Sequence, residues 1–350
     1  MVRQMNLAKN PWIEQIILFT LFVLLTTSHS FVFSKEKPKL SSAFYASLSM
    51  SVLKVLAPGD GRLYSGSGVI VGSGEVLTNC HVIRNSNKVY VMKGALRYNV
   101  TKVKVNMFKD LCLLEAPTLN LPAVNLIKPS KVKVADMAYF YGYPGGADAF
   151  FTEGRVSGLH PMNDSFVVKT TAGFSSGGSG GGLFDSQGNL IGITTFFSAG
   201  HSGGYYALPS DWIEELRLSE SSVIKPLEGL AFWELPLEDQ PNFLKFARFA
   251  SDRDWKEAII QSKSWMKEEP DNFDALLSHG KSLLNNGFTQ EAIDVLESAR
   301  SLSPDDANIL FALKNAFEKS SSDDKLLEVI RVLETIDPEE VSAGKCNMAC

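Results

Sequence analysis

The sequence predicts two parts of different fold class, an all-β part followed by an all-α part. Short apolar or alternating runs, separated by Gly, Pro, Asn and Asp, recur from Ser51 to Ala207, which is typical of a β sandwich or barrel. After Leu216 these signals stop, and amphipathic helical patterns extend from about Asn242 to Thr335. With 350 residues, 45% of them hydrophobic and 21% charged, each part is large enough to bury a core.

Residues 1–30 are typical of an export signal, because the basic Arg3 and Lys9 precede the apolar run 16–25 and small residues follow it. The run is about half of the roughly 20 residues that a helix needs to cross a bilayer, which favours a cleaved signal peptide. A retained anchor is the alternative, since apolar residues just after position 30 could extend the run. We therefore expect an exported protein, periplasmic or secreted, with residues 31–48 as a linker and membrane association only if the segment is retained.

Residues 49–218 contain the runs that we expect to form strands. These runs are Val52–Leu56, Gly68–Val71, Lys88–Met92, Val100–Val105, Leu111–Leu114, Met137–Tyr141, Phe166–Lys169, Leu190–Thr194 and Gly204–Leu208. Inside the same span, Ser179 lies in the glycine run 177–181. Glycine lets the backbone adopt a tight turn that directs amides toward a developing oxyanion, so the Gly177 and Ser179 amides are candidate donors. A flexible linker is the other explanation of such a run.

A histidine and an acid precede this serine, each beside an apolar run. His81 lies in the segment 77–83, and Asp110 precedes the run 111–114. Their order, His81, Asp110 and Ser179, is that of chymotrypsin and differs from that of subtilisin and the α/β-hydrolases. Each residue alone would usually be structural. Together they predict a triad in which Ser179 is the nucleophile, His81 the general base and then acid, and Asp110 the group that orients the imidazole.

From about Ser51 to Leu216 the chain resembles trypsin-like serine proteases, most closely their Deg (HtrA) branch. The resemblance is carried by the blocks Thr78–Val82, Asp110-Leu111, Gly177–Gly181 and Gly204–Ser210. It implies a chymotrypsin-like double barrel, with two six-stranded barrels and the site between them, and peptide-bond hydrolysis. Two residues depart from the family pattern, Gly182 where proline is usual and Gly178 where an aspartate or asparagine is usual. Without an acid at position 178, we expect no activation through an ion pair with a newly cut N-terminus.

The resemblance also places the primary specificity pocket beside the serine turn and along the strand that follows it. The candidate substrate-binding residues are Gly173, Phe174, Thr195, Phe196 and Phe197. No carboxylate is among them, and burying an unpaired cationic side chain costs several kcal/mol. We therefore expect a small or medium apolar side chain before the scissile bond. The alternative is that Asp185 or Asp148 reaches into the pocket from another loop and supplies the missing carboxylate. His201 should lie on a solvated loop that borders the pocket.

The four cysteines and the net charge indicate what to expect of disulfides, metal sites and nucleic-acid binding. Cys80 and Cys112 lie beside His81 and Asp110, where we expect two buried small apolar residues, with a disulfide as the alternative. The tail 341–350 contains the other two cysteines, which could close a small loop or join another chain. No cysteine and histidine spacing typical of a metal site occurs, so no metal and no other cofactor is expected. A net charge of −5 without a Lys or Arg cluster argues against nucleic acid as a partner.

The C-terminal part resembles tetratricopeptide repeats. A proline-containing linker is expected at residues 219–240 and repeats at 241–340, where Pro270, Pro304 and Pro338 recur at the 34-residue period of that repeat. The middle unit fits best, with small and apolar residues where paired helices must approach closely. These residues are Gly280, Ala292, Leu296 and Ala299. We expect three helix pairs, the outer two degenerate.

Taken together, these patterns predict an exported serine endopeptidase that acts on protein or peptide substrates. Its helical repeats would recruit or sense a protein partner, or serve only as a stabilising appendage. Two other functions remain open: a catalytically silent binding protein on a protease fold, and a protease that is activated by a partner. Deg proteases usually carry a PDZ domain after the barrels, and none is visible in this sequence, so PDZ-driven activation is not expected.

Overall fold

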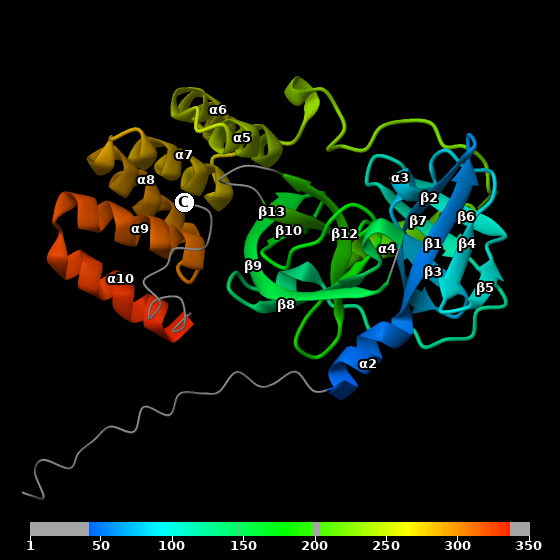
Figure 1. Cartoon of the computed structure of the whole chain (residues 1–350). Helices are drawn as coiled ribbons and strands as arrows, with labels where there is room; N and C mark the ends of the chain where they lie inside the picture. Colours follow the sequence, from blue (N-terminus) through cyan, green and yellow to red (C-terminus); the bar gives the residue numbers. More distant parts are fainter. Residues whose placement is uncertain (1–41, 147, 199–203, 337–350) are drawn as a thin grey trace, which may run out of the picture. The chain divides into compact units, whose positions relative to one another are not determined.

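The computed structural model describes residues 42–146, 148–198 and 204–336 (Figure 1). The expected export signal, most of the linker 31–48, His201, Pro338 and the cysteine-containing tail lie outside the described residues. Within the described ranges, no helix is both long and apolar enough to cross a membrane.

Eight antiparallel strands form the first sheet of the described chain, in the order β14-β6-β7-β3-β2-β1-β4-β5. They are β1 (Val52–Gly59), β2 (Arg62–Gly72), β3 (Glu75–Thr78), β4 (Tyr90–Lys93), β5 (Leu96–Asn99), β6 (Lys102–Asn106), β7 (Leu111–Glu115) and β14 (Ser222–Val223). Successive side chains of a strand point to opposite faces, so Leu53, Val55 and Ala57 of β1 enter the core. The sheet has eight strands where the resemblance implied six: seven come from the protease span itself, and β14 comes from beyond it and pairs with β6.

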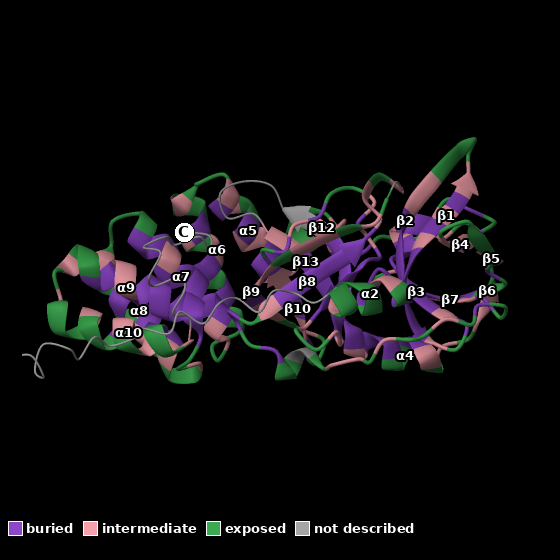
Figure 2. Ribbon diagram, turned by 60° about the horizontal axis from the view of Figure 1, so that its bottom comes forward, coloured by how far each residue is buried: buried purple, intermediate pink, exposed green. Residues whose placement is uncertain are grey.

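A closed six-stranded barrel follows, in the order β10-β13-β12-β11-β8-β9. Its strands are β8 (Met137–Gly142), β9 (Phe150–Met162), β10 (Ser165–Thr170), β11 (Gly182–Phe184), β12 (Leu190–Ser198) and β13 (Gly204–Pro209). Buried apolar residues fill it, among them Phe140, Val156, Leu183 and Ile191. The two sheets make the chymotrypsin-like double barrel that was predicted. Figure 2 shows the buried residues concentrated along β8, β10 and β13 and along two helices of the C-terminal part, α7 (Phe273–Asn285) and α8 (Thr289–Leu302).

Short helices flank the strands. They are α2 (Ser42–Ser51), α3 (Cys80–Ile83) and α4 (Ile213–Leu218), with 3-10 turns at Pro129–Lys131, Pro144–Gly146, Ser210–Trp212 and Leu237–Asp239. Helix α2 lies against the second barrel, because the rings of Phe44 and Tyr45 contact Tyr139 and Tyr141 of β8 at centroid distances of 5.1 and 5.3 Å.

Six helices follow in the described residues, so the predicted all-α region with paired helices is confirmed. They are α5 (Asn242–Ser251), α6 (Trp255–Glu268), α7 (Phe273–Asn285), α8 (Thr289–Leu302), α9 (Ala307–Ser320) and α10 (Asp323–Ile336). Helices α6, α7 and α9 begin at polar N-caps, Asp254, Asn272 and Asp306, whose side chains accept from backbone amides of the first turn. The close approach predicted at Gly280 is present, since a Cβ there would lie 2.5 Å from Leu296 Cγ.

The second barrel and the helices belong to one compact unit. Val134 and Ala135, which precede β8, share a hydrophobic core with α7, α8 and α9. His160 of β9 contacts Asp274 of α7 through Nδ1 and Oδ2, 2.6 Å apart, and its ring stacks on Phe243 of α5 at 4.5 Å. Apolar packing and a hydrogen bond therefore join the β part to the C-terminal helices.

Candidate active site

Asp110 lies at the end of the turn that leads into β7, fully buried, with a φ of 52°. Positive φ is uncommon for a residue with a side chain. Here it is held by the neighbouring backbone, because the Asp110 carbonyl accepts from the Cys80 amide at 3.2 Å and from Asn79 Nδ2 at 3.0 Å. These bonds attach the turn that contains the acid to the segment that contains His81.

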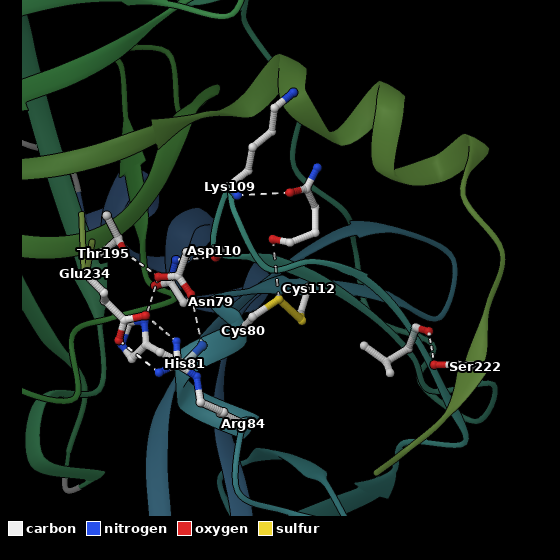
Figure 3. The surroundings of a disulfide bond; sticks show 12 residues. Asn79, Cys80, His81, Arg84, Lys109, Asp110, Cys112, Thr195, Ser222 and Glu234 are labelled. Carbon is white, nitrogen blue, oxygen red and sulfur yellow. Dashed lines mark hydrogen bonds and ion pairs between the residues drawn. A yellow bond between two sulfur atoms is a disulfide. The ribbon is translucent and has the colours of Figure 1, made fainter. Parts of the chain in front are cut away.

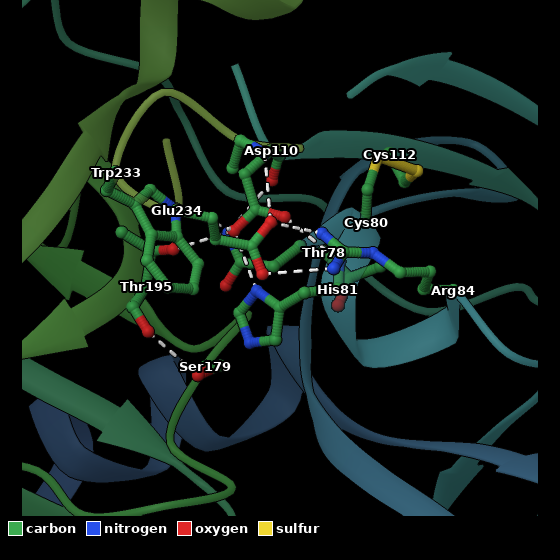
Figure 4. Close-up of polar contacts among 12 residues, drawn as sticks. Thr78, Cys80, His81, Arg84, Asp110, Cys112, Ser179, Thr195, Trp233 and Glu234 are labelled. Carbon is green, nitrogen blue, oxygen red and sulfur yellow. Dashed lines mark hydrogen bonds and ion pairs between the residues drawn. A yellow bond between two sulfur atoms is a disulfide. The ribbon is translucent and has the colours of Figure 1, made fainter. Parts of the chain in front are cut away.

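His81 is in the first turn of α3 and makes two bonds with the Asp110 carboxylate. Its backbone amide donates to Oδ1 at 2.9 Å, and its Nδ1 lies 2.7 Å from Oδ2 (Figure 4). A carboxylate only accepts hydrogen bonds, so Nδ1 carries the hydrogen and Nε2 is the basic nitrogen. The pair therefore fixes both the orientation and the tautomer of the imidazole.

Two further donors reach Asp110 Oδ2. Thr195 Oγ1, from β12, donates at 2.9 Å, and Trp233 Nε1 donates at 3.3 Å. A buried carboxylate needs such partners, since an unpaired buried charge is strongly unfavourable. Asp110 thus receives four hydrogen bonds in all from His81, Thr195 and Trp233.

The turn that contains Ser179 requires glycine at two positions. Gly177 has a φ of 89° and Gly180 a φ of 84°, values that L-residues with a side chain rarely adopt. A Cβ at Gly177 would collide with the Gly145 amide, and one at Gly180 with the carbonyl of Ser67. The glycine run is therefore a tightly packed turn, and the flexible-linker explanation does not apply to it.

The Ser179 hydroxyl donates to the carbonyl oxygen of Thr195 at 2.8 Å. Within the described residues it makes no hydrogen bond to His81, although both side chains line one cleft and Figure 4 shows the His81 ring between Asp110 and Ser179. To bond with His81, the hydroxyl would first have to leave the Thr195 carbonyl by rotating about the Ser179 side-chain bond.

Two backbone amides of this turn have no acceptor in the described part of the chain, those of Gly177 and Ser179. The Ser176 carbonyl accepts from the Gly145 amide at 2.7 Å. Because the carbonyl and amide of a trans peptide point in opposite directions, this bond turns the Gly177 amide away from Gly145. The Gly177 carbonyl accepts from Ser67 Oγ at 3.0 Å, which holds the next peptide as well.

The cleft has a volume of about 400 Å³. Its lining residues are Tyr64, Ser65, His81, Val82, Phe174, Ser175, Ser176, Gly177, Ser179, Thr195, Phe196 and Trp233. Three of the expected substrate-binding residues, Phe174, Thr195 and Phe196, are thus together on its wall, and no described carboxylate is.

Of the other expected pocket residues, Gly173 and Asp185 lie away from the cleft wall. Gly173 is not on the cleft wall; its carbonyl accepts from Thr152 Oγ1 at 2.8 Å. Phe197 pairs with Tyr205 in the barrel, and its side chain lies outside the described residues. The Asp185 carboxylate accepts from the amides of Gln187 and Asn189 in a turn away from the cleft.

Trp233 was missed by the sequence analysis, although it touches both His81 and Asp110. It lies in the expected linker 219–240, well after the protease span. The signal in the sequence was the pair Phe232-Trp233, two large aromatic residues in a segment expected to be a linker.

Cys80 and Cys112 form a disulfide in the structure, so the expectation of two separate apolar residues was wrong (Figure 3). Thr78 of β3 is paired with Cys112 of β7, and the chain then turns at Asn79 into α3. This turn brings the Cys80 Cα within 5.0 Å of the Cys112 Cα, a separation suited to a disulfide. The bond joins the segment that contains His81 to the strand that follows Asp110.

Comparison with known proteins gives matches within the β part of the chain. Residues 66–193 match the family model of the trypsin-like peptidase domain. The β part of this chain is therefore similar to trypsin-like peptidase domains, and the relatives it matches are serine proteases of the HtrA and DegP type.

Two relatives illustrate the extent of the similarity. The magnetosome formation protease MamE of Magnetospirillum gryphiswaldense is 32% identical over 193 residues, which cover 49% of this chain and 25% of that protein. A probable periplasmic serine endoprotease DegP-like of Chlamydia pneumoniae is 31% identical over 156 residues, which cover 41% of this chain and 32% of that protein. The chain thus spans a quarter to a third of the length of these relatives.

Solved structures are similar over about half of the chain. The serine endoprotease from Yersinia pestis has 26% identity and a TM-score of 0.45, covering 49% of this chain and 65% of that one. A protease from M. tuberculosis in its active form has 23% identity and a TM-score of 0.47, covering 54% of this chain and 88% of that one.

Proposed function

We propose that this protein is a serine endopeptidase that hydrolyses peptide bonds through Ser179, His81 and Asp110. The observation that carries the proposal is the His81 Nδ1–Asp110 Oδ2 bond of 2.7 Å, which leaves Nε2 basic beside a cleft that Ser179 also lines. A hydroxyl is a weak nucleophile unless an adjacent base takes its proton. The homologous serine proteases support the same chemistry.

In this mechanism the Ser179 hydroxyl leaves the Thr195 carbonyl and turns to His81 Nε2. Nε2 takes the proton as Oγ attacks the carbonyl carbon of the substrate, and Asp110 stabilises the imidazolium. The oxyanion accepts from the Gly177 and Ser179 amides, which have no other acceptor in the described chain. The C–N bond then breaks, with the Nε2 proton going to the leaving amine.

Water completes the cycle by the same steps. His81 Nε2 takes a proton from a water molecule, whose oxygen attacks the acyl carbon of the Ser179 ester. Collapse of the second tetrahedral intermediate breaks the bond between Oγ and the acyl carbon, and the proton returns from Nε2 to Ser179. The chain then releases the new carboxylate end of the peptide.

We further infer that the protein is exported to the periplasm and that its repeats recruit or sense a protein partner. The names of the DegP-like relatives support a periplasmic location, and the amino-terminal pattern supports export by a signal peptide or anchor. The repeats are joined to the peptidase barrel by the His160–Asp274 contact, so a ligand on them would act on a structure continuous with the catalytic domain.

Labelling with a fluorescent serine-reactive phosphonate tests the catalytic proposal. The wild-type protein and Ser176→Ala, a control serine exposed on the same cleft wall, should both be labelled, whereas Ser179→Ala should not. Peptide hydrolysis should fall by several orders of magnitude in Ser179→Ala and in His81→Ala, because such residues act as a unit. A folded wild-type protein that neither reacts nor hydrolyses peptides would favour the silent binding protein.

A further inference from the structure

The segment 227–235, which connects the barrels to the helices, binds along the side of the first sheet that contains the catalytic residues. The Leu227 amide donates to the Arg84 carbonyl at 2.8 Å, and the Phe232 amide donates to the Phe108 carbonyl at 3.0 Å. Ala231 and Phe232 are fully buried. The segment is therefore anchored on both sides of the catalytic pair, three residues after His81 and two residues before Asp110.

Trp233 projects from this segment onto the pair. Its Nε1 donates to Asp110 Oδ2 at 3.3 Å, and its ring meets the His81 ring edge-on at a centroid distance of 5.5 Å and an angle of 85°. On its other side the indole stacks on Phe196 at 5.2 Å. The indole thus covers the imidazole and carboxylate and donates to the oxygen that already receives His81 Nδ1.

Glu234 holds the tryptophan in place. Its carboxylate forms a two-point ion pair with Arg84, in which Nη1 and Oε1 are 3.0 Å apart, and its Oε2 also accepts from the Ala231 amide at 2.9 Å (Figure 4). Burial acts to raise the pKa of Glu234, but the hydrogen bonds from Arg84 and Ala231 outweigh it and lower this pKa. Arg84 directly follows α3, so the ion pair fixes Trp233 relative to the helix that contains His81.

We propose that Trp233 is a positioning residue of the catalytic centre: its indole N–H and ring hold His81 and Asp110 in their paired geometry. The proposal rests on the proposed function, because it assigns the pair a role in peptide hydrolysis. A positioning residue contacts no reacting atom, so its loss lowers kcat and leaves KM nearly unchanged. By contrast, a residue that only binds substrate would raise KM.

Trp233→Phe keeps an aromatic ring and removes only the donor. We expect kcat to fall about tenfold, the loss typical of one hydrogen bond to a charged group, with KM within about twofold of wild type. Glu234→Gln weakens the ion pair that anchors the tryptophan. It should also lower kcat, but by less than Trp233→Phe does. Trp255→Phe, the same change at the start of α6, is the control and should leave both constants unaltered.

A second readout does not depend on activity. In the Ser179→Ala background, the proton between His81 Nδ1 and Asp110 Oδ2 should give a far-downfield proton resonance, which Trp233→Phe should broaden or shift and Trp255→Phe should not. Unchanged kcat together with an unchanged resonance in Trp233→Phe would overturn the positioning role. If the wild-type protein hydrolyses no peptide, the proposed function fails, and the resonance alone then decides whether Trp233 positions the pair.

Discussion

Thr195 contacts two of the proposed catalytic residues through two different atoms. Its Oγ1 donates to Asp110 Oδ2 at 2.9 Å, and its backbone carbonyl accepts the Ser179 hydroxyl at 2.8 Å. The residue is buried in β12, one position beyond Thr194, which bonds to the glycine turn. Strand β12 therefore fixes the acid and the resting position of the nucleophile relative to each other.

Replacing Thr195 by valine should lower kcat for peptide hydrolysis by about ten- to a hundredfold, because Asp110 loses one hydrogen bond to its charged form. Valine has nearly the same shape, and the backbone carbonyl remains, so the fold and the Ser179 contact should persist. Steady-state kinetics on a peptide substrate measure the effect. Thr195→Ser, which restores the hydroxyl, should recover most of the rate; equal rates for Val and Ser would contradict this role.

Gly177→Ala should remove the oxyanion donor. The new Cβ would collide with the Gly145 amide, and the φ of 89° is unfavourable for alanine, so the peptide must rotate. Losing one such donor lowers kcat by a factor of about 10²–10³. Gly94→Ala is the control, since Gly94 also has a positive φ but open space around it. Comparable activity in the two variants would argue against an oxyanion role for the Gly177 amide.

Cleavage-site profiling on a peptide library should show a preference for Val, Ala or Leu before the scissile bond. The described lining of the cleft contains Phe174 and Phe196 and no carboxylate to pair with a cationic side chain. Such a side chain would lose its hydration without a partner. The pocket assignment would be refuted by a clear preference for Arg or Lys.

Asp306 should make the C-terminal helices less stable at neutral pH than at pH 4. Burial, the largest effect, raises its pKa from 3.8 to about 6, against the lowering effect of the Ile309 amide and nearby Lys281. Between these values the native state binds more protons than the unfolded state, so stability falls as pH rises through about 4 to 6 and stays lower above it.

Asp306→Asn keeps the N-cap acceptor of α9 and removes the charge. At pH 7 it should stabilise the protein by about 2–3 kcal/mol, the equivalent of about two pKa units, and at pH 4 by much less. Thermal unfolding at both pH values measures the difference. Asp254→Asn, at the exposed N-cap of α6, controls for the substitution itself; the same gain at both pH values in Asp306→Asn would count against the burial argument.

The sequence alone determined the fold class of each part of the chain, all-β and then all-α. Strand-like runs up to Ala207 and helical patterns after Asn242 are local signals, because the periodicity of one strand or helix lies within a few consecutive residues. The 34-residue spacing of Pro270 and Pro304 is likewise visible without a structure. The same holds for the order of His81, Asp110 and Ser179 along the chain, from which the candidate site was predicted.

Only the tertiary structure decided which residues surround that site. Trp233 reaches Asp110 from 123 positions away, and Thr195 reaches it from 85. The sequence analysis missed Trp233 and named Thr195 only as a pocket residue, since contacts to Asp110 depend on how two sheets and a returning segment pack together. The disulfide between Cys80 and Cys112 was wrongly expected to be absent for the same reason: whether two cysteines pair depends on the separation and direction of their Cα–Cβ bonds, which the fold sets and the spacing of 32 residues does not.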